Sequence, residues 1–171
     1  MPGYVIHLSV ANEYIRKYPK EIDDYSKYIE GVIFPDSVID KSLTHYGEKS
    51  SKVNLRKFLS ENEINNDYNK GYFMHLVTDY VFYNKFLECY SKDIYNDYDI
   101  LNKRLQKRFN VEIPDYIKNR VFYKEGETKI LNLEKVVKFI DTVSEYKLSY
   151  IQERVLNNDK NWLELKTLRK L

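Results

Sequence analysis

Of the 171 residues, 43% are hydrophobic, which is enough to form a buried core and excludes a wholly disordered chain. The 28 Lys and Arg residues nearly balance the 26 Asp and Glu residues, and the formal net charge of +2 argues against a dedicated nucleic-acid-binding protein. Because β-rich folds need many turns, the low counts of five Gly and four Pro favour an all-α fold.

Apolar residues recur at helical spacing in the first half of the chain. A first helix is expected over 8–18, where Pro19 stops it, and a second over 22–33, ending before Pro35 because proline restricts the residue that precedes it. A loop over 35–51 leads to a short helix over 53–59. The most apolar segment, about 67–90, is predicted to be a buried central helix.

The second half continues the helical pattern. Helices are predicted over 93–109 and 114–123, followed after a turn by a long amphipathic helix over 132–157. A short tail helix is expected to carry Trp162, Leu165 and Leu168. No segment alternates strictly enough to predict a strand, so we expect residues 1–171 to form one multi-helix domain.

The sequence gives no sign of a membrane-spanning segment or of a disulfide. No run approaches the roughly 18 apolar residues that cross a bilayer, and the single Cys89 excludes an intramolecular disulfide. The N-terminus also lacks the basic and apolar regions of a signal peptide. A cytoplasmic protein without a transmembrane segment is therefore expected.

His75 and Asp79 stand four residues apart on the predicted central helix, so their side chains project from one face. An imidazole and a carboxylate placed in this way can bind one divalent cation. The alternative is a hydrogen bond between the two side chains, because a polar pair in so apolar a helix needs a partner.

The remaining candidate ligands precede this helix. Asp36 ends the sequence Gly-Val-Ile-Phe-Pro-Asp, just past the second helix, where it could also act as a helix N-cap. His45 lies nine residues later in the same loop, with a structural role as an equal alternative. His7 lies at the start of the first helix, where it could be a surface or capping residue. These three His are all that the chain contains.

The order of these motifs resembles the zinc-dependent phospholipase C family. The resemblance is carried by His7, Gly-Val-Ile-Phe-Pro-Asp36, Leu-Thr-His45 and Gly-Tyr-Phe-Met-His75-Leu-Val-Thr-Asp79, within residues 1–90. That family includes bacterial phospholipases C and the amino-terminal domain of glycosylphosphatidylinositol-specific phospholipase D. It implies an all-helical fold with a metal cluster between the helices.

Carried over to this chain, the resemblance implies that Asp36, His45, His75 and Asp79 bind one zinc ion. Asp79 would bridge to a second ion, to which His7 would also contribute, and manganese or iron could replace zinc. Such a centre supports phosphoester hydrolysis by activated water. Asp36 would then be the catalytic carboxylate that orients or deprotonates this water.

The chain departs from the family pattern at three points. It begins Met1-Pro2, where the secreted enzymes use an amino-terminal tryptophan as a ligand. Tyr83 and Lys85 occupy the region where those enzymes have a further His. No His-x-x-x-Glu follows, so a three-metal cluster is not expected. Asp97 and Asp99 are candidates to complete a partial second site, although an acidic helix start is the favoured explanation for them.

Three tyrosines and a basic stripe complete the set of candidate functional residues. Tyr72, Tyr80 and Tyr83 flank the proposed site and could line a substrate pocket, with core packing as the alternative. Lys103, Arg104, Lys107 and Arg108 could bind phosphate groups or form an ordinary solvated helix face.

The sequence thus favours a divalent-metal-dependent phosphoesterase. Its substrate would be a phosphodiester or phosphomonoester, either a phosphorylated small molecule or a phospholipid head group. The alternative is a non-catalytic helical protein that keeps a structural metal site or binds a partner. An HD-type phosphohydrolase is disfavoured, because no His-Asp dipeptide occurs.

Overall fold

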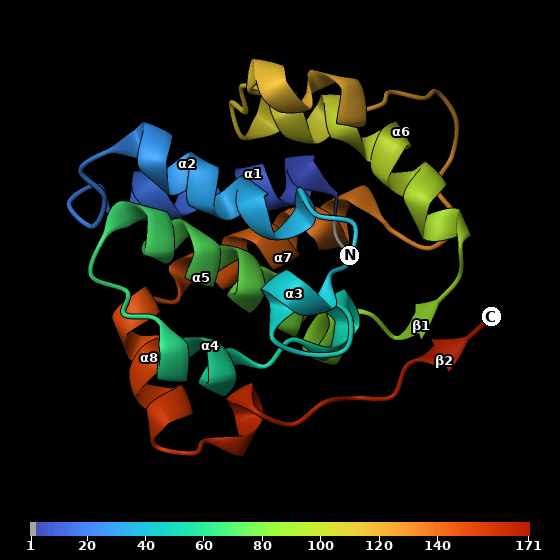
Figure 1. The fold of residues 1–171 in the computed structure, drawn as a ribbon. Coiled ribbons are helices and arrows are strands. Elements are labelled where there is room, and N and C mark those ends of the chain that lie inside the picture. The colour runs from blue at the N-terminus through green and yellow to red at the C-terminus, as the bar shows by residue number, and fades with distance from the viewer. Residues whose placement is uncertain (1–2) are drawn as a thin grey trace.

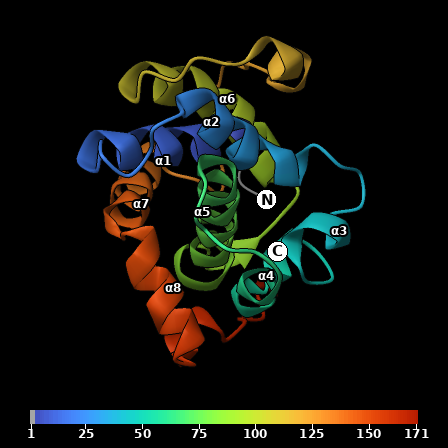
Figure 2. The same ribbon diagram turned by 60° about the vertical axis from the view of Figure 1, so that its left-hand side comes forward.

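The computed structural model describes residues 3–171 and confirms an all-α fold. The helix α5 (Asp67–Val81) runs through the middle, and the other helices surround it (Figure 1). Figure 2 shows α1 and α2 on one side of α5, α7 and α8 on a second, and α3 and α4 on a third. The bounds of these helices are α1 Tyr4–Lys17, α2 Tyr25–Ile33, α3 Ser42–His45, α4 Leu55–Glu61, α6 Asp93–Arg108, α7 Leu133–Glu145 and α8 Leu148–Leu156.

Short elements connect the helices. A π-helical turn, Phe82–Phe86, directly follows α5. Two strands of two residues each, β1 (Cys89–Tyr90) and β2 (Arg169–Lys170), pair in parallel. The 3₁₀ turns are Phe34–Asp36, Ser50–Lys52, Asp115–Arg120 and Lys160–Trp162.

Asp and Asn side chains begin four of the helices. Asp24, Asn54, Asn66 and Asn132 each accept a hydrogen bond from the backbone N–H three residues further on. These bonds satisfy N–H groups that have no partner inside the helix. Local sequence therefore defines where α2, α4, α5 and α7 begin.

Two glycines allow α2 and α5 to cross at very close range. A Cβ atom at Gly31 would lie 2.0 Å from the carbonyl oxygen of Tyr68, and one at Gly71 would lie 2.0 Å from that of Tyr28. Each glycine thus faces the backbone of the opposite helix, where no other side chain fits. The crossing sets the position of Asp36, which follows α2, relative to His75 and Asp79 on α5.

The central helix is shorter than the predicted range of 67–90. The α-helix ends at Val81, the chain widens into the π turn, and the backbone becomes extended at Leu87. The side-chain amide of Asn84 donates to the carbonyl oxygen of Tyr80, at 2.9 Å, within this region. Eleven residues of α5, from Gly71 to Val81, are buried, which agrees with the prediction of a buried helix.

The long helix predicted over 132–157 is wrong in one respect, because the structure divides it into α7 and α8. The helix α1 supplies the reason. The hydroxyl of Tyr18 donates to the carbonyl oxygen of Glu145 at the end of α7, and Leu148 N–H at the start of α8 donates to the hydroxyl of Tyr14. Tyr14 of α1 and Tyr18, which directly follows α1, thus satisfy the backbone groups that the break exposes.

Two further predicted helices differ from the structure. The segment 114–123 forms the 3₁₀ turn Asp115–Arg120 after Pro114. The expected tail helix ends at Trp162, which is buried, and Leu165 and Leu168 lie in an extended segment. Asn84 Oδ1 accepts the backbone N–H of Lys166 at 2.7 Å, and β2 pairs with β1, so distant residues hold this segment extended.

Within residues 3–171, none of the helices combines the length and the apolar character that a bilayer crossing requires.

Candidate metal centre

Five side chains from four elements meet beside α5. They are His7 of α1, Asp36 of the Phe34–Asp36 turn, His45 of α3, and His75 and Asp79 of α5. Each is at most 3% exposed. The ligand atoms of Asp36, His45, His75 and Asp79 all lie within 4.8 Å of one another. All five metal-ligating candidates from the sequence therefore lie in one buried cluster, which we call the His–Asp cluster.

Each carboxylate of the cluster faces imidazoles on two sides. The Nε2 atom of His45 lies 2.9 Å from Asp79 Oδ2 and 3.5 Å from Asp36 Oδ1, and that of His75 lies 3.3 Å and 3.6 Å from the same two atoms. The other two oxygens face His7, whose Nε2 lies 3.1 Å from Asp79 Oδ1 and 3.8 Å from Asp36 Oδ2. The cluster thus offers two adjoining ligand sets that share both carboxylates.

Backbone carbonyls orient two of the three imidazoles. The Nδ1–H of His75 donates to the carbonyl oxygen of Val32 at 2.7 Å, and that of His45 donates to the carbonyl oxygen of Lys41 at 3.1 Å. These bonds keep a proton on Nδ1 of each ring, so that Nε2, which faces the carboxylates, would be the atom that binds a metal ion. This is the usual outer-shell arrangement of a histidine that binds a metal.

The inward-facing atoms have no hydrogen-bond partner in the described part of the chain. Eight buried nitrogen and oxygen atoms of the five side chains are in this state, including all four carboxylate oxygens. Leaving such groups unpaired costs free energy, because water no longer solvates them. A divalent cation would satisfy imidazole nitrogens and carboxylate oxygens together, so the donor set fits a metal ion.

The cluster keeps its carboxylates ionised without a cation. Burial raises the pKa of Asp36 and Asp79 and is the largest single effect, but the neighbouring imidazoles, His75 foremost, together outweigh it and hold both pKa values below the usual range. Burial lowers the pKa of His75, and the two carboxylates outweigh it and raise that pKa to about 10. Without a cation, the protonated imidazole of His75 therefore supplies the positive charge that a bound metal ion would otherwise provide.

His7 differs from the other two histidines. Burial and the neighbouring His75 charge lower its pKa, so it stays neutral. Its ring stacks on that of His75, with centroids 3.6 Å apart, and its Nδ1 has no partner within residues 3–171. The ligand set that contains His7 is thus held less firmly than the one that contains His45 and His75.

The three candidate pocket tyrosines have different surroundings. The hydroxyl of Tyr72 donates to the carbonyl oxygen of Thr44 at 2.7 Å, and that of Tyr80 donates to the carbonyl oxygen of Glu164 at 2.7 Å. Both rings are buried. Tyr83 is buried too, but it lines a surface pocket. Of the three, Tyr83 alone borders one of the described pockets.

Asp97 and Asp99 do not join the cluster. The carboxylate of Asp97 accepts three backbone hydrogen bonds, from Lys129, Ile130 and Leu131 at 2.6–2.9 Å, and holds that loop against α6. Asp99 lies 3.6 Å from the ammonium of Lys124. Both carboxylates therefore bind neighbouring chain segments and are not available to complete a second metal site.

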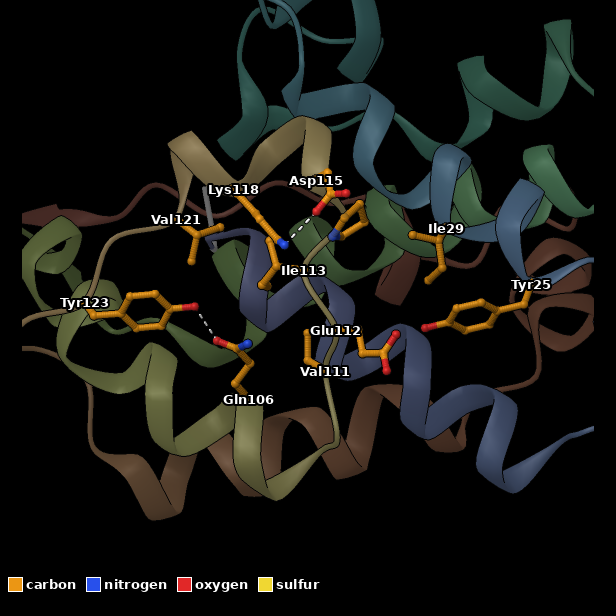
Figure 3. A pocket seen from close by; sticks show the side chains of 11 residues that line it. Tyr25, Ile29, Gln106, Val111, Glu112, Ile113, Asp115, Lys118, Val121 and Tyr123 are labelled. Carbon is orange, nitrogen blue, oxygen red and sulfur yellow. Dashed lines mark hydrogen bonds and ion pairs between the residues drawn. The ribbon is translucent and has the colours of Figure 1, made fainter.

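The largest described pocket lies away from the cluster (Figure 3). It has a volume of about 770 Å³ and lies between Tyr25 and Ile29 of α2 and the segment 111–123. Lys118 pairs with Asp115 across its edge, at 2.6 Å. The basic stripe lies near the end of α6. Its members, Lys103, Arg104, Lys107 and Arg108, are all exposed.

Several residues near the cluster were missed by reasoning from the sequence. Tyr4 donates from its hydroxyl to the carbonyl oxygen of Asp36 at 3.0 Å, and Lys41 donates to the same atom at 2.8 Å. Tyr98 is 5% exposed, and its hydroxyl has no partner among the described residues. Burial and then the nearby Tyr95 and Asp79 raise the pKa of Tyr98 well above its usual value. The contact between Tyr4 and Asp36 spans 32 residues of the chain, and no local pattern indicates it.

Comparisons with family models, with curated proteins and with solved structures find no match to this chain.

Proposed function

We propose that this protein is a divalent-metal-dependent phosphoesterase whose centre is the His–Asp cluster. The observation that carries the proposal is the set of eight buried, unpartnered nitrogen and oxygen atoms within residues 3–171, all in side chains that bind metals. The order of these residues in the sequence, which resembles the zinc-dependent phospholipase C family, supports zinc as the metal and a phosphodiester or phosphomonoester as the substrate. Manganese and iron suit the same ligands.

The ligand sets assign a role to each side chain. His45, His75, Asp36 Oδ1 and Asp79 Oδ2 would hold one cation, and His7 with the other two carboxylate oxygens would hold a second. Bound divalent cations supply positive charge that stabilises phosphoryl oxygens and activates water for attack on phosphorus. Asp36, whose lowered pKa keeps it ionised, is better suited to orient the attacking water than to store its proton.

Metal content is the first test. We expect protein purified without chelator to contain at least about one equivalent of metal, either zinc, manganese or iron. The variant His75→Ala should lose this metal. The control Tyr80→Phe removes a hydroxyl from the same helix and should keep the metal, because that hydroxyl bonds to carbonyl oxygens of residues 161 and 164. Absence of metal from the unmodified protein would overturn the proposal.

Hydrolysis is the second test. The metal-loaded protein should cleave bis(p-nitrophenyl) phosphate, p-nitrophenyl phosphate or p-nitrophenylphosphorylcholine, and His75→Ala should abolish that activity. Asp36→Asn should lower kcat more than it raises KM if Asp36 acts on the water. The assay separates an enzyme from a protein that only carries metal.

One observation favours the alternative of a structural metal site in a non-catalytic protein. All five side chains of the His–Asp cluster are almost completely buried, and structural zinc sites are usually closed to water. In that case the metal would be stoichiometric, its removal would unfold the protein, and none of the phosphate esters would be cleaved.

A further inference from the structure

A second pocket, separate from the one in Figure 3, is surrounded by lysines. It has a volume of about 380 Å³, within the usual range for small-molecule sites. All of the charged residues that line it are lysines, and Ser, Thr and Tyr supply most of the remaining wall. We call it the lysine pocket. Its lysines are Lys49, Lys52, Lys166 and Lys170.

The fold builds this pocket from three segments that are far apart in the sequence. The loop 46–53 leaves α3 at His45 and returns to it, because Asn54 N–H donates to the carbonyl oxygen of His45 at 3.3 Å. The C-terminal segment 166–170 is fixed by the β1–β2 pairing and by Leu171 N–H, which donates to the carbonyl oxygen of Tyr90 at 2.9 Å. Tyr83 and Tyr95 complete the wall.

Among the described residues, no acidic side chain lines the lysine pocket to balance the charge of its lysines. Lys52 lies 3.7 Å from the exposed Glu48, and the ammonium of Lys166 donates to the carbonyl oxygen of Leu87 at 2.9 Å. The pocket therefore keeps a local excess of positive charge in a chain whose net charge is only +2. Like charges around one cavity repel each other, and an anion placed between them removes that repulsion.

Chain segments that line the lysine pocket directly follow elements that carry the His–Asp cluster. Tyr83 lies four residues after Asp79, in the π turn that directly follows α5. On α6, the ring of Tyr95 packs against that of Tyr98 with centroids 6.0 Å apart. Tyr98 in turn carries the buried hydroxyl for which the described residues offer no partner. His45 itself begins the loop that carries Lys49 and Lys52.

We propose that the lysine pocket binds a phosphate group of the substrate next to the catalytic centre. Lysine ammoniums attract the charge of a phosphate, and the hydroxyls of Ser50, Ser51 and Thr167 can donate to its oxygens. The assignment of this ligand as substrate rests on the proposed function, whereas the binding of phosphate does not. The same chemistry suits a soluble phosphorylated molecule and a phospholipid head group.

Direct binding tests the proposal. Inorganic phosphate and pyrophosphate are titrated into the protein by calorimetry, and Lys49→Ala/Lys170→Ala removes one lysine from each of two opposing segments. Because two charges are lost, we expect binding at least about tenfold weaker. The control Lys20→Ala/Lys57→Ala removes the same charge from two exposed positions outside the pocket and should change affinity less than about twofold. Circular dichroism checks that both variants fold.

The outcomes separate this proposal from the function proposed above. His75→Ala should still bind phosphate, because none of the residues that line the pocket belongs to the His–Asp cluster. Sedimentation with phosphatidylcholine vesicles, with and without phosphatidic acid, distinguishes the source. Binding to phosphatidic acid that the Lys49/Lys170 variant loses indicates a lipid head group, and binding to free phosphate alone indicates a soluble ligand. No binding of either probe, or equal loss in the two lysine variants, would overturn the proposal.

Discussion

The imidazoles of His7, His45 and His75 differ in how firmly the chain holds them. Carbonyl oxygens fix the Nδ1 atoms of His45 and His75, whereas His7 is positioned mainly by its stacking on His75. A ligand that is already oriented loses less conformational freedom when it binds. The position between His45 and His75 should therefore take up a cation before the one beside His7.

Tyr98 gives a prediction at the scale of one residue. Its buried hydroxyl has no partner within residues 3–171, and such a group costs about 1–3 kcal/mol. Tyr98→Phe should therefore raise the free energy of unfolding of the metal-free protein by about 1 kcal/mol. If the Tyr98 hydroxyl instead forms a hydrogen bond at the metal-bound centre, Tyr98→Phe should stabilise the metal-bound protein less, or should destabilise it. Urea unfolding with and without metal measures both values.

The neighbouring Tyr95 supplies a control for this prediction. Its hydroxyl lies 3.3 Å from that of Tyr90 and its side chain is half exposed. Tyr95→Phe should therefore change stability by less than about 0.5 kcal/mol in either state. Destabilisation of the metal-free protein by Tyr98→Phe would show that its hydroxyl has a partner after all.

At the scale of elements, the crossing of α2 and α5 holds Asp36 in register with His75 and Asp79. Gly31→Ala or Gly71→Ala would place a methyl group 2.0 Å from a backbone oxygen of the other helix, so the two helices must move apart. Alanine in place of glycine favours a helix interior by up to about 1 kcal/mol. The clash at the crossing should outweigh this gain, so we expect the free energy of unfolding to fall by about 1–3 kcal/mol. Metal affinity should fall as well, because Asp36 follows α2.

Gly3 offers the matched control for the two helix-crossing glycines. A Cβ atom at Gly3 would lie 3.5 Å from the nearest atoms of Tyr98, which is an ordinary contact. Gly3→Ala should therefore cost less than about 1 kcal/mol. Thermal unfolding and zinc titration of the three variants test this. Equal effects of Gly3→Ala and Gly31→Ala would contradict a role for the close crossing.

The presence of a helix could be predicted from the sequence more accurately than the residue at which it ends. The apolar period of 3.6 residues is local, and it indicates α1, α2 and α6 close to their true positions and α5 with its true start. The break between α7 and α8 has neither Gly nor Pro, and it depends on hydroxyls of Tyr14 and Tyr18, more than 120 residues away in the chain. No local pattern contains that information.

The same distinction applies to the candidate site. His75 and Asp79 could be placed together because helical spacing fixes which side chains share a face. The position of Asp36, His45 and His7 beside them came from the resemblance to a family, and their convergence depends on how α1, α2 and α3 pack around α5. The lysine pocket could not be predicted, because the C-terminal segment is held there by pairing with β1 and by contacts of Lys166 with Asn84 and Leu87.

At the scale of the whole molecule, buried tyrosines make the stability of the fold depend on pH. The chain has 17 Tyr, and many are buried among the helices. Burial raises the pKa of Tyr14 and Tyr80 to about 12 and that of Tyr28 well above its ordinary value of 10.0. The folded protein thus keeps protons on several phenols that the unfolded chain releases near pH 10.

The sign of the effect on stability follows from these pKa values. Above about pH 10 the unfolded state binds fewer protons than the folded state, so the free energy of unfolding falls as the pH rises. The contribution is fully present below pH 10 and is lost by up to about 1.4 kcal/mol per pH unit for each fully buried tyrosine. Because several tyrosines act together, we expect cooperative unfolding between about pH 10 and pH 12.

Urea unfolding measured from about pH 8 to pH 11, together with tyrosinate absorbance, tests this expectation. Tyr28→Phe removes one fully buried phenol, whose hydroxyl donates to the carbonyl oxygen of Ala11, and should make the fall in stability with pH less steep. Tyr150→Phe, on α8, removes a phenol that is 49% exposed and should leave the slope unchanged. Ionisation of most tyrosines while the circular dichroism remains native would contradict the prediction, because buried phenols can lose their protons only if water reaches them.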